Sequence, residues 1–506
     1  MISRRRATLL AATLVLAAAA AVPQSVAAAK GRAAKLARAA QPKAPLDHAG
    51  RWLTDRKGRV VVLHGVNMVY KRPPYRPDAI GFDAADAAFL RRNGFNTVRL
   101  GMIYAGVEPQ PGSYDGAYIR AVRRTEKLLA KQRIFSMIDF HQDLYSEKFT
   151  GEGFPPWAVL DDGFPAEPLT GFSNTYITSP GLNRAFANLW ANAGGPGAVG
   201  LQDRYAFAWQ RVARSFRRRP YNLGYDIFNE PWPGNTTVLT CANTEGCPQF
   251  EQQVLAPMEQ KSIDAIRAVD RRHLVWYEPV VTTNFGPKNN YPDTGDPRAG
   301  MSFHVYCLAG GAGSASDSEC ETLEQLALDN AQQRAGLNGD TLLMSEFGAT
   351  DMEPVIKRMV DRADRGMVSW QWWHYCGCDD PTTQGPGDVQ ALVRNPKRKP
   401  SGDNVFLDKL RALERPYPQA VAGTPERYFF DRGDRRFELA FSKRRPSGKG
   451  RFRRGLTDIF VPRLQYPGGY RARVKGATVL SRRDRRHLIL RGHARAARVS
   501  VAITPR

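Results

Sequence analysis

Short apolar runs alternate with segments of helical spacing over most of the chain. The first run, residues 59–69, is apolar almost throughout, as expected of a parallel strand that is buried on both faces. Seven further strands are predicted at 95–102, 134–143, 223–228, 273–279, 301–307, 341–346 and 367–375. The segments with helical spacing are 82–92, 118–132, 205–219, 250–269, 321–335 and 352–365.

Eight strands that alternate with helices over about 370 residues predict an α/β fold, the (β/α)8 TIM barrel. We place this domain at residues 47–414, and a doubly wound open sheet is the alternative. In the barrel, polar residues at the carboxyl ends of the strands meet on one face. The segment 144–200 has no clear period and is rich in Gly, Pro and aromatic residues, and loops of this length are usually functional.

The pattern changes after Pro416-Tyr-Pro418. Short runs, several of them alternating, follow at 427–430, 436–441, 456–461, 470–474, 487–490 and 498–503, with turn signals such as Pro467-Gly-Gly469 between them. This pattern predicts a small antiparallel β-sandwich domain at residues 415–506.

The N-terminus has the features of a secretory signal peptide. A basic stretch, residues 1–6, precedes an apolar stretch of 16 residues, 7–22, and small residues follow. We assign the signal peptide to residues 1–29 and a disordered leader, rich in Ala, Lys, Arg and Pro, to 30–46. An uncleaved membrane anchor is the alternative, although 16 residues fall short of the roughly 20 that span a bilayer. The protein is expected to be secreted, and its Ala- and Arg-rich composition is typical of a bacterial source.

Six cysteines fit an exported protein, because disulfides persist in oxidising compartments. They occur as three sequence-local pairs, Cys241/Cys247, Cys307/Cys320 and Cys376/Cys378, and we predict disulfides within the first two. Fifteen connectivities are formally possible, and a bridge within the last pair would be tight. The chain contains no CxxC or HExxH pattern, so we predict no metal and no cofactor.

The formal charge of +24 is concentrated at the C-terminal end. Residues 415–506 contain 24 Lys and Arg against 6 Asp and Glu, a surplus of 18. Such a domain suits an anionic membrane surface or an acidic lipid headgroup, and a solvated basic surface without a partner is the simpler alternative. Export argues against nucleic acid as a partner.

Two carboxylates lie at the ends of predicted strands. Glu230 follows the strand 223–228 and precedes Pro231, and Glu346 ends the strand 341–346. An Asn-Glu before Pro can simply terminate a strand, but a pair of such acids is typical of a glycosidase. Glu278 is a third carboxylate at a strand end, and the Trp276-Tyr277 before it does not match a nucleophile motif.

Five segments carry a resemblance to a known family. They are Val66-Asn-Met-Val-Tyr-Lys-Arg-Pro-Pro-Tyr75, Asp139-Phe-His-Gln-Asp143, Gly153-Phe-Pro-Pro-Trp157, Phe228-Asn-Glu-Pro-Trp-Pro-Gly234 and Ser345-Glu-Phe-Gly348. Together they resemble glycoside hydrolase family five of clan A and, within it, the endoglycoceramidases. The resemblance implies retaining hydrolysis of the β-bond between the oligosaccharide and ceramide of glycosphingolipids. It implies that Glu230 is the general acid/base and Glu346 the nucleophile.

The resemblance also implies a set of substrate-binding residues: Lys71, Arg99, His141, Asp143, Asn229, His304, Tyr306 and Trp373. We expect Arg99 beside Glu346, a hydrogen bond from Tyr306 to Glu346, and Asn229 on the sugar 2-OH. Trp373 is expected to stack on a sugar. Lys71 and Asp143 are expected to bind sugar hydroxyls, although Lys71 could instead be a solvated loop cation.

Ceramide requires an apolar channel, and the long loop offers apolar residues for its wall. They are Phe149, Phe154, Trp157, Val159, Leu160, Phe164, Leu169 and Phe172. The same residues could instead fold back as a satellite core. Two other functions stay open at this point: a secreted β-glucanase or other oligosaccharide hydrolase on the same barrel, and a non-catalytic protein that binds glycolipids or surfaces.

Overall fold

A computed structural model describes residues 31, 33–241, 243–306, 317–382 and 387–506. The predicted signal peptide lies outside these residues. No helix in the described part of the chain combines the length and apolar character needed to cross a membrane.

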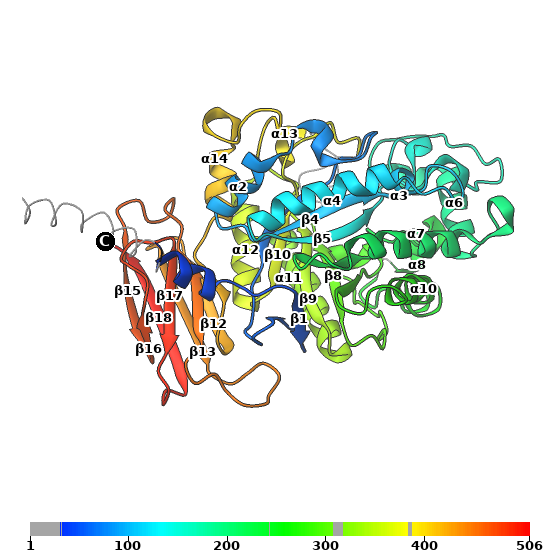
Figure 1. The fold of residues 1–506 in the computed structure, drawn as a ribbon. Coiled ribbons are helices and arrows are strands. Elements are labelled where there is room, and N and C mark those ends of the chain that lie inside the picture. The colour runs from blue at the N-terminus through cyan, green and yellow to red at the C-terminus, as the bar shows by residue number, and fades with distance from the viewer. Residues whose placement is uncertain (1–30, 32, 242, 307–316, 383–386) are drawn as a thin grey trace, which may run out of the picture.

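Eight parallel strands close into a barrel, which confirms the predicted fold class and excludes the open sheet (Figure 1). The strands are β3 (His64–Met68), β4 (Thr97–Ile103), β5 (Phe135–His141), β6 (Asn222–Asp226), β7 (Leu274–Tyr277), β8 (Ala299–Val305), β9 (Thr341–Phe347) and β10 (Ser369–Trp372). Each strand pairs with its successor, and β10 returns to β3. The strand β6 is shorter than predicted, so Glu230 lies four residues beyond its end rather than directly at it.

Helices surround the barrel (Figure 1). The main ones are α2 (Ala84–Arg92), α4 (Gly116–Lys131), α7 (Leu201–Phe216), α10 (Ala256–Arg267), α11 (Asp317–Asn338) and α12 (Glu353–Gly366). They occupy the segments that the apolar spacing predicted. Asp115 caps α4, since its side chain accepts hydrogen bonds from the backbone N–H groups of Ala117 and Tyr118.

Shorter elements fill the connections. They are η1 (Pro77–Ile80), α3 (Tyr104–Val107), η2 (Glu147–Phe149), η3 (Pro156–Ala158), α5 (Asn174–Thr178), α6 (Pro180–Trp190), η4 (Pro196–Ala198), α8 (Asn235–Cys241), α9 (Pro248–Phe250), the π-helical η5 (Glu251–Leu255), η6 (Val281–Phe285), α13 (Gly387–Gln390), η7 (Gly402–Asn404) and α14 (Leu407–Leu413). The helix α6 lies in the segment 144–200, which has no clear period. Its signal was local, because Ser179 is an N-cap and Pro180 occupies the first turn.

The leader was predicted to be disordered, and this is wrong for residues 33–46. Residues 33–40 form a helix, and a hairpin of β1 (Leu46–Ala49) and β2 (Trp52–Asp55) begins at Leu46. Alanine has the highest helix propensity, and tertiary contacts hold the end of this helix. The buried Arg59 donates from Nη1 to the carbonyl oxygen of Ala40 at 2.6 Å and from Nη2 to that of Gln41 at 2.7 Å.

The C-terminal domain consists of two four-stranded antiparallel sheets, which confirms the predicted sandwich. One has the order β11 (Tyr417–Ala420), β14 (Leu456–Phe460), β17 (His487–Gly492), β16 (Ala477–Val479), and the other the order β12 (Thr424–Asp431), β13 (Arg436–Ser442), β18 (Arg498–Pro505), β15 (Tyr470–Lys475). Alternate residues of β13, among them Phe437, Leu439 and Phe441, enter the core between the sheets.

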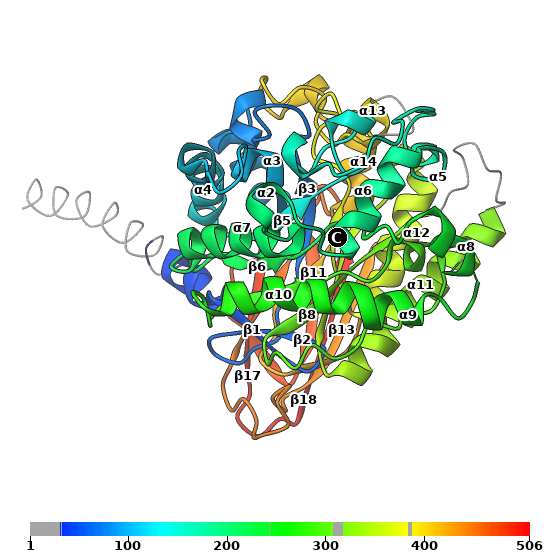
Figure 2. The same cartoon turned by 90° about the vertical axis from the view of Figure 1, so that its right-hand side faces the viewer.

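This domain packs against the end of the barrel where the strands begin. The Tyr417 hydroxyl donates to the carbonyl oxygen of Gly94, three residues before β4 begins. The Tyr417 ring stacks on His64 at the start of β3. Gly94 has φ +87°, and a Cβ there would lie 2.3 Å from the Phe460 ring, so the contact requires glycine. Figure 2 views the barrel from its opposite end, with the C-terminal sheets behind it.

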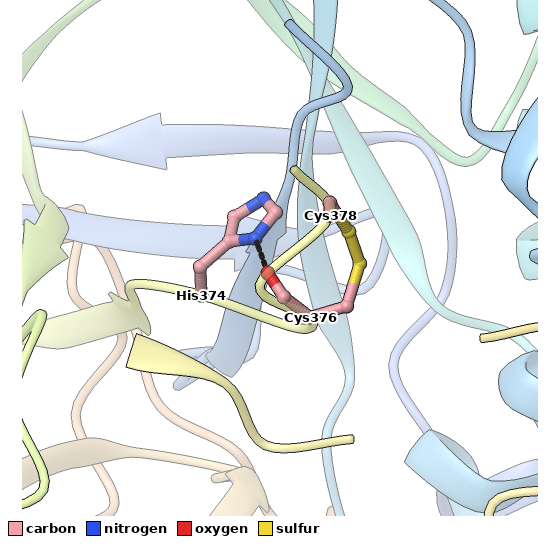
Figure 3. Close-up of side chains that lie close together, drawn as sticks. All are labelled: His374, Cys376 and Cys378. Atoms are coloured by element: carbon pink, nitrogen blue, oxygen red, sulfur yellow. Dashed lines mark hydrogen bonds between the residues drawn. A yellow bond between two sulfur atoms is a disulfide. The ribbon is translucent and has the colours of Figure 1, made fainter. Parts of the chain in front are cut away.

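The predicted disulfide Cys241–Cys247 is present, and so is a bridge between Cys376 and Cys378, which the sequence left open. Cys320 is also disulfide-bonded, whereas Cys307 lies outside the described residues. Beside the second bridge, His374 donates from Nδ1 to the carbonyl oxygen of Cys376 at 2.6 Å (Figure 3). These three side chains are close enough for a metal site, but the oxidised sulfurs are not the thiolates that would bind one.

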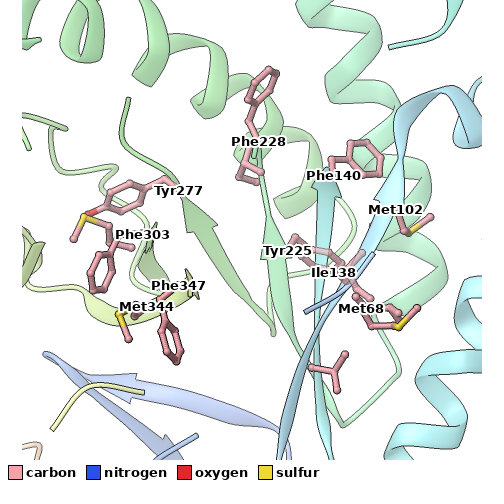
Figure 4. Packing of buried hydrophobic residues seen from close by; sticks show 14 of the residues in the cluster. Met68, Met102, Ile138, Phe140, Tyr225, Phe228, Tyr277, Phe303, Met344 and Phe347 are labelled. Carbon is pink, nitrogen blue, oxygen red and sulfur yellow. The ribbon is translucent and has the colours of Figure 1, made fainter. Parts of the chain in front are cut away.

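Alternation along the barrel strands separates two environments. Val98 and Leu100 of β4 and Ile138 and Phe140 of β5 pack outward against the helices, in the core that Figure 4 illustrates. The residues between them face the barrel interior. Near the beginning of the strands this interior is apolar, and its residues are Met137, Leu223, Trp276 and Leu343. Nearer the carboxyl ends it becomes polar and charged, and the candidate site lies there.

Candidate active site

A bulge in β9 turns Glu346 into the barrel. Phe303 pairs with Met344, but the next residue of β8, His304, pairs with Glu346, so Ser345 is an extra residue in β9. Such a bulge shifts the side-chain alternation by one position. Ser345 accepts a hydrogen bond from Ser302 inside the barrel at 2.6 Å, and Glu346 is directed to the same interior.

Glu346 has two donors and is 4 % exposed. The Arg99 guanidinium forms an ion pair with Oε1, and the Tyr306 hydroxyl donates to Oε2 at 2.8 Å. Burial raises the pKa of Glu346, while the charges of His304 and Arg99 act against that rise. Both contacts that the sequence predicted for this carboxylate, Arg99 and Tyr306, are confirmed.

Glu230 approaches from the loop after β6. Its backbone has φ +45°, an unusual conformation for a residue other than glycine, and its N–H donates to Oε2 of Glu278 at 2.9 Å. Its Oε1 lies 2.8 Å from both His304 Nδ1 and Asn284 Nδ2. Asn284, which belongs to η6, was not predicted from the sequence.

The two candidate carboxylates lie close together across His304. One carboxylate oxygen of Glu230, one of Glu346 and a ring nitrogen of His304 lie within 4.8 Å of one another. His304 Nδ1 is 3.6 Å from Oε2 of Glu346. Burial by itself would lower the pKa of His304, but the charges of Glu278 and Glu346 raise it well above its usual value. His304 Nδ1 therefore lies between the two carboxylates, 2.8 Å from Glu230 and 3.6 Å from Glu346.

Arg99 organises the polar interior of the barrel. It is fully buried, and its guanidinium contacts Asp226 at 2.7 Å, Glu278 at 2.8 Å and Asp139 at 3.0 Å, besides Glu346. It also donates to Oδ1 of Asn229 at 2.8 Å. Burial would lower the pKa of Arg99, but these carboxylates raise it. The sequence predicted Arg99 beside Glu346 and noted Glu278 at a strand end, but it did not single out Asp139 or Asp226.

Glu278 is an accessory to the site. It accepts the Glu230 N–H, pairs with Arg99 and lies 3.3 Å from Nε2 of His304. Burial would raise its pKa, but His304 and Arg99 lower it to about 2, so it is ionised. Its geometry is that of a residue that positions Glu230 and His304.

A second polar group lies beside the carboxylate pair. Lys71 is buried and donates to Oδ2 of Asp143 at 2.6 Å, so it is not a solvated loop cation. His141 bonds through Nδ1 to Asp139 at 2.9 Å and faces Asp143 with Nε2 at 3.6 Å. Burial would lower the pKa of His141, but Asp139 raises it to about 10. The structure thus brings all ten sequence-predicted residues into one region, while their individual roles remain predictions.

Trp373 covers this second group. Its ring stacks on His141 with centroids 5.2 Å apart, Lys71 Nζ lies 4.6 Å from the ring centre, and Nε1 donates to Gln390 at 2.8 Å. Trp370 and Trp372 are fully buried and belong to the core. Stacking of Trp373 on a sugar remains a prediction.

The apolar residues of the long loop mostly fold back. Phe149 and Phe154 are core residues, and five others pack against the core: Trp157, Val159, Leu160, Leu169 and Phe172. Phe164 is 50 % exposed. The satellite-core interpretation therefore holds for seven of the eight candidates, and Phe164 alone among them presents a large apolar surface to solvent.

Comparison with known proteins gives a consistent assignment. The sequence model of cellulase (glycosyl hydrolase family 5) matches residues 54–379, and that of the glycoside hydrolase family 5 C-terminal domain matches residues 415–504. Endoglycoceramidase I of Rhodococcus hoagii is 33% identical over 454 residues, which cover 87% of this chain and 85% of that protein. Endoglycoceramidase of Cyanea nozakii is 29% identical over 429 residues, with 77% and 79% covered.

A solved structure supports the same relationship. Endo-glycoceramidase II from Rhodococcus sp. has a TM-score of 0.73 and 30% sequence identity, covering 89% of this chain and 99% of that one. The resemblance to endoglycoceramidases that the motifs carried is thereby confirmed, for the barrel and the C-terminal domain alike. The chain is a glycoside hydrolase and belongs to glycoside hydrolase family 5.

Proposed function

We propose that this protein is a secreted, retaining endoglycoceramidase, which hydrolyses the β-bond between the oligosaccharide and ceramide of glycosphingolipids. The observation that carries the proposal is the carboxylate pair: oxygens of Glu230 and Glu346 lie within 4.8 Å of each other. Carboxyl groups about 5–5.5 Å apart are typical of retaining glycosidases, whereas inverting enzymes leave room for a water between them.

In the proposed first step, Glu346 attacks the anomeric carbon of the sugar while the bond between that carbon and the ceramide oxygen breaks. Glu230 donates its proton to that oxygen, and the sugar remains covalently bound to Glu346. Water then attacks the anomeric carbon, gives a proton to Glu230 and releases Glu346. The Arg99 guanidinium and the Tyr306 hydroxyl favour the ionised nucleophile, although burial opposes ionisation.

The relatives support both the intermediate and the substrate class. A lactosyl-enzyme intermediate and a complex with ganglioside GM3 have been solved for endo-glycoceramidase II from Rhodococcus sp.. In this chain Asn229 is held by Arg99 and by the carbonyl oxygen of Gln142, and we propose that it binds the sugar 2-OH. Lys71, Asp143 and Trp373 would bind the sugars of the headgroup. Export is supported by the disulfides.

The proposal predicts release of ceramide and an intact oligosaccharide when the mature chain is incubated with glycosphingolipids. The assay would compare a glycosphingolipid panel with cello- and manno-oligosaccharides, and proton NMR of the first sugar released would report its β-configuration. The match to the cellulase model supports one alternative function, that of a β-glucanase. Hydrolysis of the soluble glycans alone would establish the β-glucanase function, and inactivity on every substrate would favour a non-catalytic binding protein.

We also propose that the basic C-terminal domain contacts anionic membrane surfaces. The exposed cations Lys57, Arg454 and Arg491 surround a hollow of about 420 Å³ at the domain junction, which has no acidic residue in its lining. Each cation near an anionic bilayer contributes about 1 kcal/mol. The double variant Arg454→Gln/Arg491→Gln is therefore expected to bind vesicles of phosphatidylcholine and phosphatidylglycerol about 30-fold more weakly.

Vesicle co-sedimentation measures this affinity. Arg123→Gln/Arg218→Gln removes the same charge from the exposed barrel surface and serves as the control. If both double variants bind the vesicles equally weakly, the net charge of the chain, and not the C-terminal domain, causes the binding. Equal binding to vesicles of phosphatidylcholine alone and to the anionic mixture would contradict the proposal.

A further inference from the structure

Glu152 is a buried acid next to the proposed sugar site. The resemblance motif begins at the residue after it, so the sequence did not single it out. Its side chain is inaccessible to solvent, and neither carboxyl oxygen has a hydrogen-bond partner among the described residues. An unpaired buried carboxyl group is costly and indicates a role.

The backbone fixes Glu152 against Asp143. The backbones of the two residues form an antiparallel bridge. The N–H of Asp143 donates to the backbone carbonyl oxygen of Glu152 at 3.0 Å, and the N–H of Glu152 donates to that of Asp143 at 2.9 Å. Gly151 and Gly153 flank it, and a Cβ at residue 151 would lie 1.9 Å from the Asp143 carbonyl oxygen. The loop can therefore approach this closely only with glycine at position 151, and a change of the Glu152 side chain leaves the bridge in place.

The carboxyl group lies behind the groups proposed to bind sugar. Its Oε1 is 3.9 Å from both Lys71 Nζ and His141 Nε2, and that His141 nitrogen has no hydrogen-bond partner in the described part of the chain. These separations are too long for direct hydrogen bonds but allow one bridging oxygen. Lys71 also contacts Asp143 at 2.6 Å and Asp380 at 3.2 Å.

The charges of this cluster favour a neutral Glu152. Asp143 and Asp380 already flank Lys71, and Asp139 pairs with His141. Burial raises the pKa of Glu152 well above its usual value, with Lys71 opposing and Asp143 adding to the rise. A metal could use the oxygen and nitrogen atoms of His141, Asp143 and Glu152, but the Lys71 ammonium already supplies the positive charge there.

We propose that Glu152 is a positioning residue: its carboxyl group, 3.9 Å behind Lys71 Nζ and His141 Nε2 and tied to Asp143 through the backbone bridge, fixes these three groups for the headgroup sugar. The proposal rests on the proposed function, because it takes Lys71 and Asp143 as sugar-binding groups. Glu152 itself is inaccessible and does not touch the sugar.

Steady-state kinetics of Glu152→Gln and Glu152→Ala on lactosylceramide test this role. Glutamine keeps the shape and neutrality of the acid, so KM and kcat of Glu152→Gln are expected to stay within about threefold of wild type. Glu152→Ala is expected to raise KM about 10–100-fold with little change in kcat, as for other residues that support binding groups from behind. The control is Glu147→Ala, which removes an exposed acid of the same loop.

A Glu152→Ala enzyme with wild-type KM would overturn the proposal, and so would one that loses kcat and thermal stability at unchanged KM. A crystal structure of Glu152→Ala gives a readout that does not need activity: Lys71, Asp143 or His141 is expected to be displaced, and an unchanged trio would also overturn it. Failure of the proposed function is distinguishable, because wild type itself would then release no ceramide.

Discussion

Replacing Glu346 with Gln is expected to lower ceramide release by about 10⁴-fold or more, because removal of a nucleophile leaves only binding and electrostatic contributions. The amide has nearly the volume of the carboxyl group and can still accept a hydrogen bond from Tyr306, so the fold is expected to persist. Release of ceramide measured by chromatography gives the rate, and thermal unfolding reports on the fold.

The partner variant separates the two carboxylates. Glu230→Gln is expected to lose about 10²–10⁴-fold on glycolipids, the usual contribution of general acid–base catalysis. With an aryl glycoside, whose leaving group needs no proton, the rate at which Glu346 is glycosylated should fall far less. Added azide should then replace water in the second step and give a β-glycosyl azide. Glu147→Gln serves as the matched control. Glu346→Gln with more than about one hundredth of wild-type activity would contradict the assignment of the nucleophile.

Replacing Arg99 with Met is expected to abolish activity and to destabilise the fold by about 3–5 kcal/mol, the usual effect of leaving buried charges unpaired. Four carboxylates would then lack their shared cation: Asp139, Asp226, Glu278 and Glu346. Burial already raises the pKa of Asp226 despite Arg99, so loss of this cation should raise it further. Chemical denaturation of both proteins measures the difference.

The pH dependence gives the sign of this effect. Without Arg99, the native state holds protons on its buried carboxyl groups that the unfolded chain releases. Stability of the variant is therefore expected to decline between about pH 5 and 8 relative to wild type. Arg99→Lys restores the charge without the planar fork and should recover part of the stability but little activity. A deficit that does not change with pH would contradict the interpretation.

The sequence predicted the barrel and the principal site because both depend on local pattern. Apolar runs gave all eight strands, and the carboxylates near their ends gave Glu230 and Glu346. Asp139 and Asp226 were missed, although Asp139 has the same strand parity as His141 and their shared side could have been inferred. Asn284 was not predictable in this way, because a short 3₁₀ helix with no apolar period positions it.

Two other differences arise from tertiary contacts. Residues 33–40 are helical although their composition resembled a disordered segment, because Arg59 binds the carbonyl groups at the end of the helix. The inward direction of Glu346 depends on the extra residue in β9, and strict alternation from Leu343 would have directed it toward the helices. A bulge of this kind leaves no periodic signal in a single sequence.

The position of the C-terminal domain has a consequence for geometry at a lipid surface. The domain adjoins the beginning of the barrel strands, whereas Glu230 and Glu346 open at their carboxyl ends, about 20 Å away for strands of seven residues. If this domain held the enzyme to one bilayer, the active site would face away from that bilayer. The enzyme would then act in trans, as a bridge to glycolipids displayed on a facing bilayer or carried in a micelle.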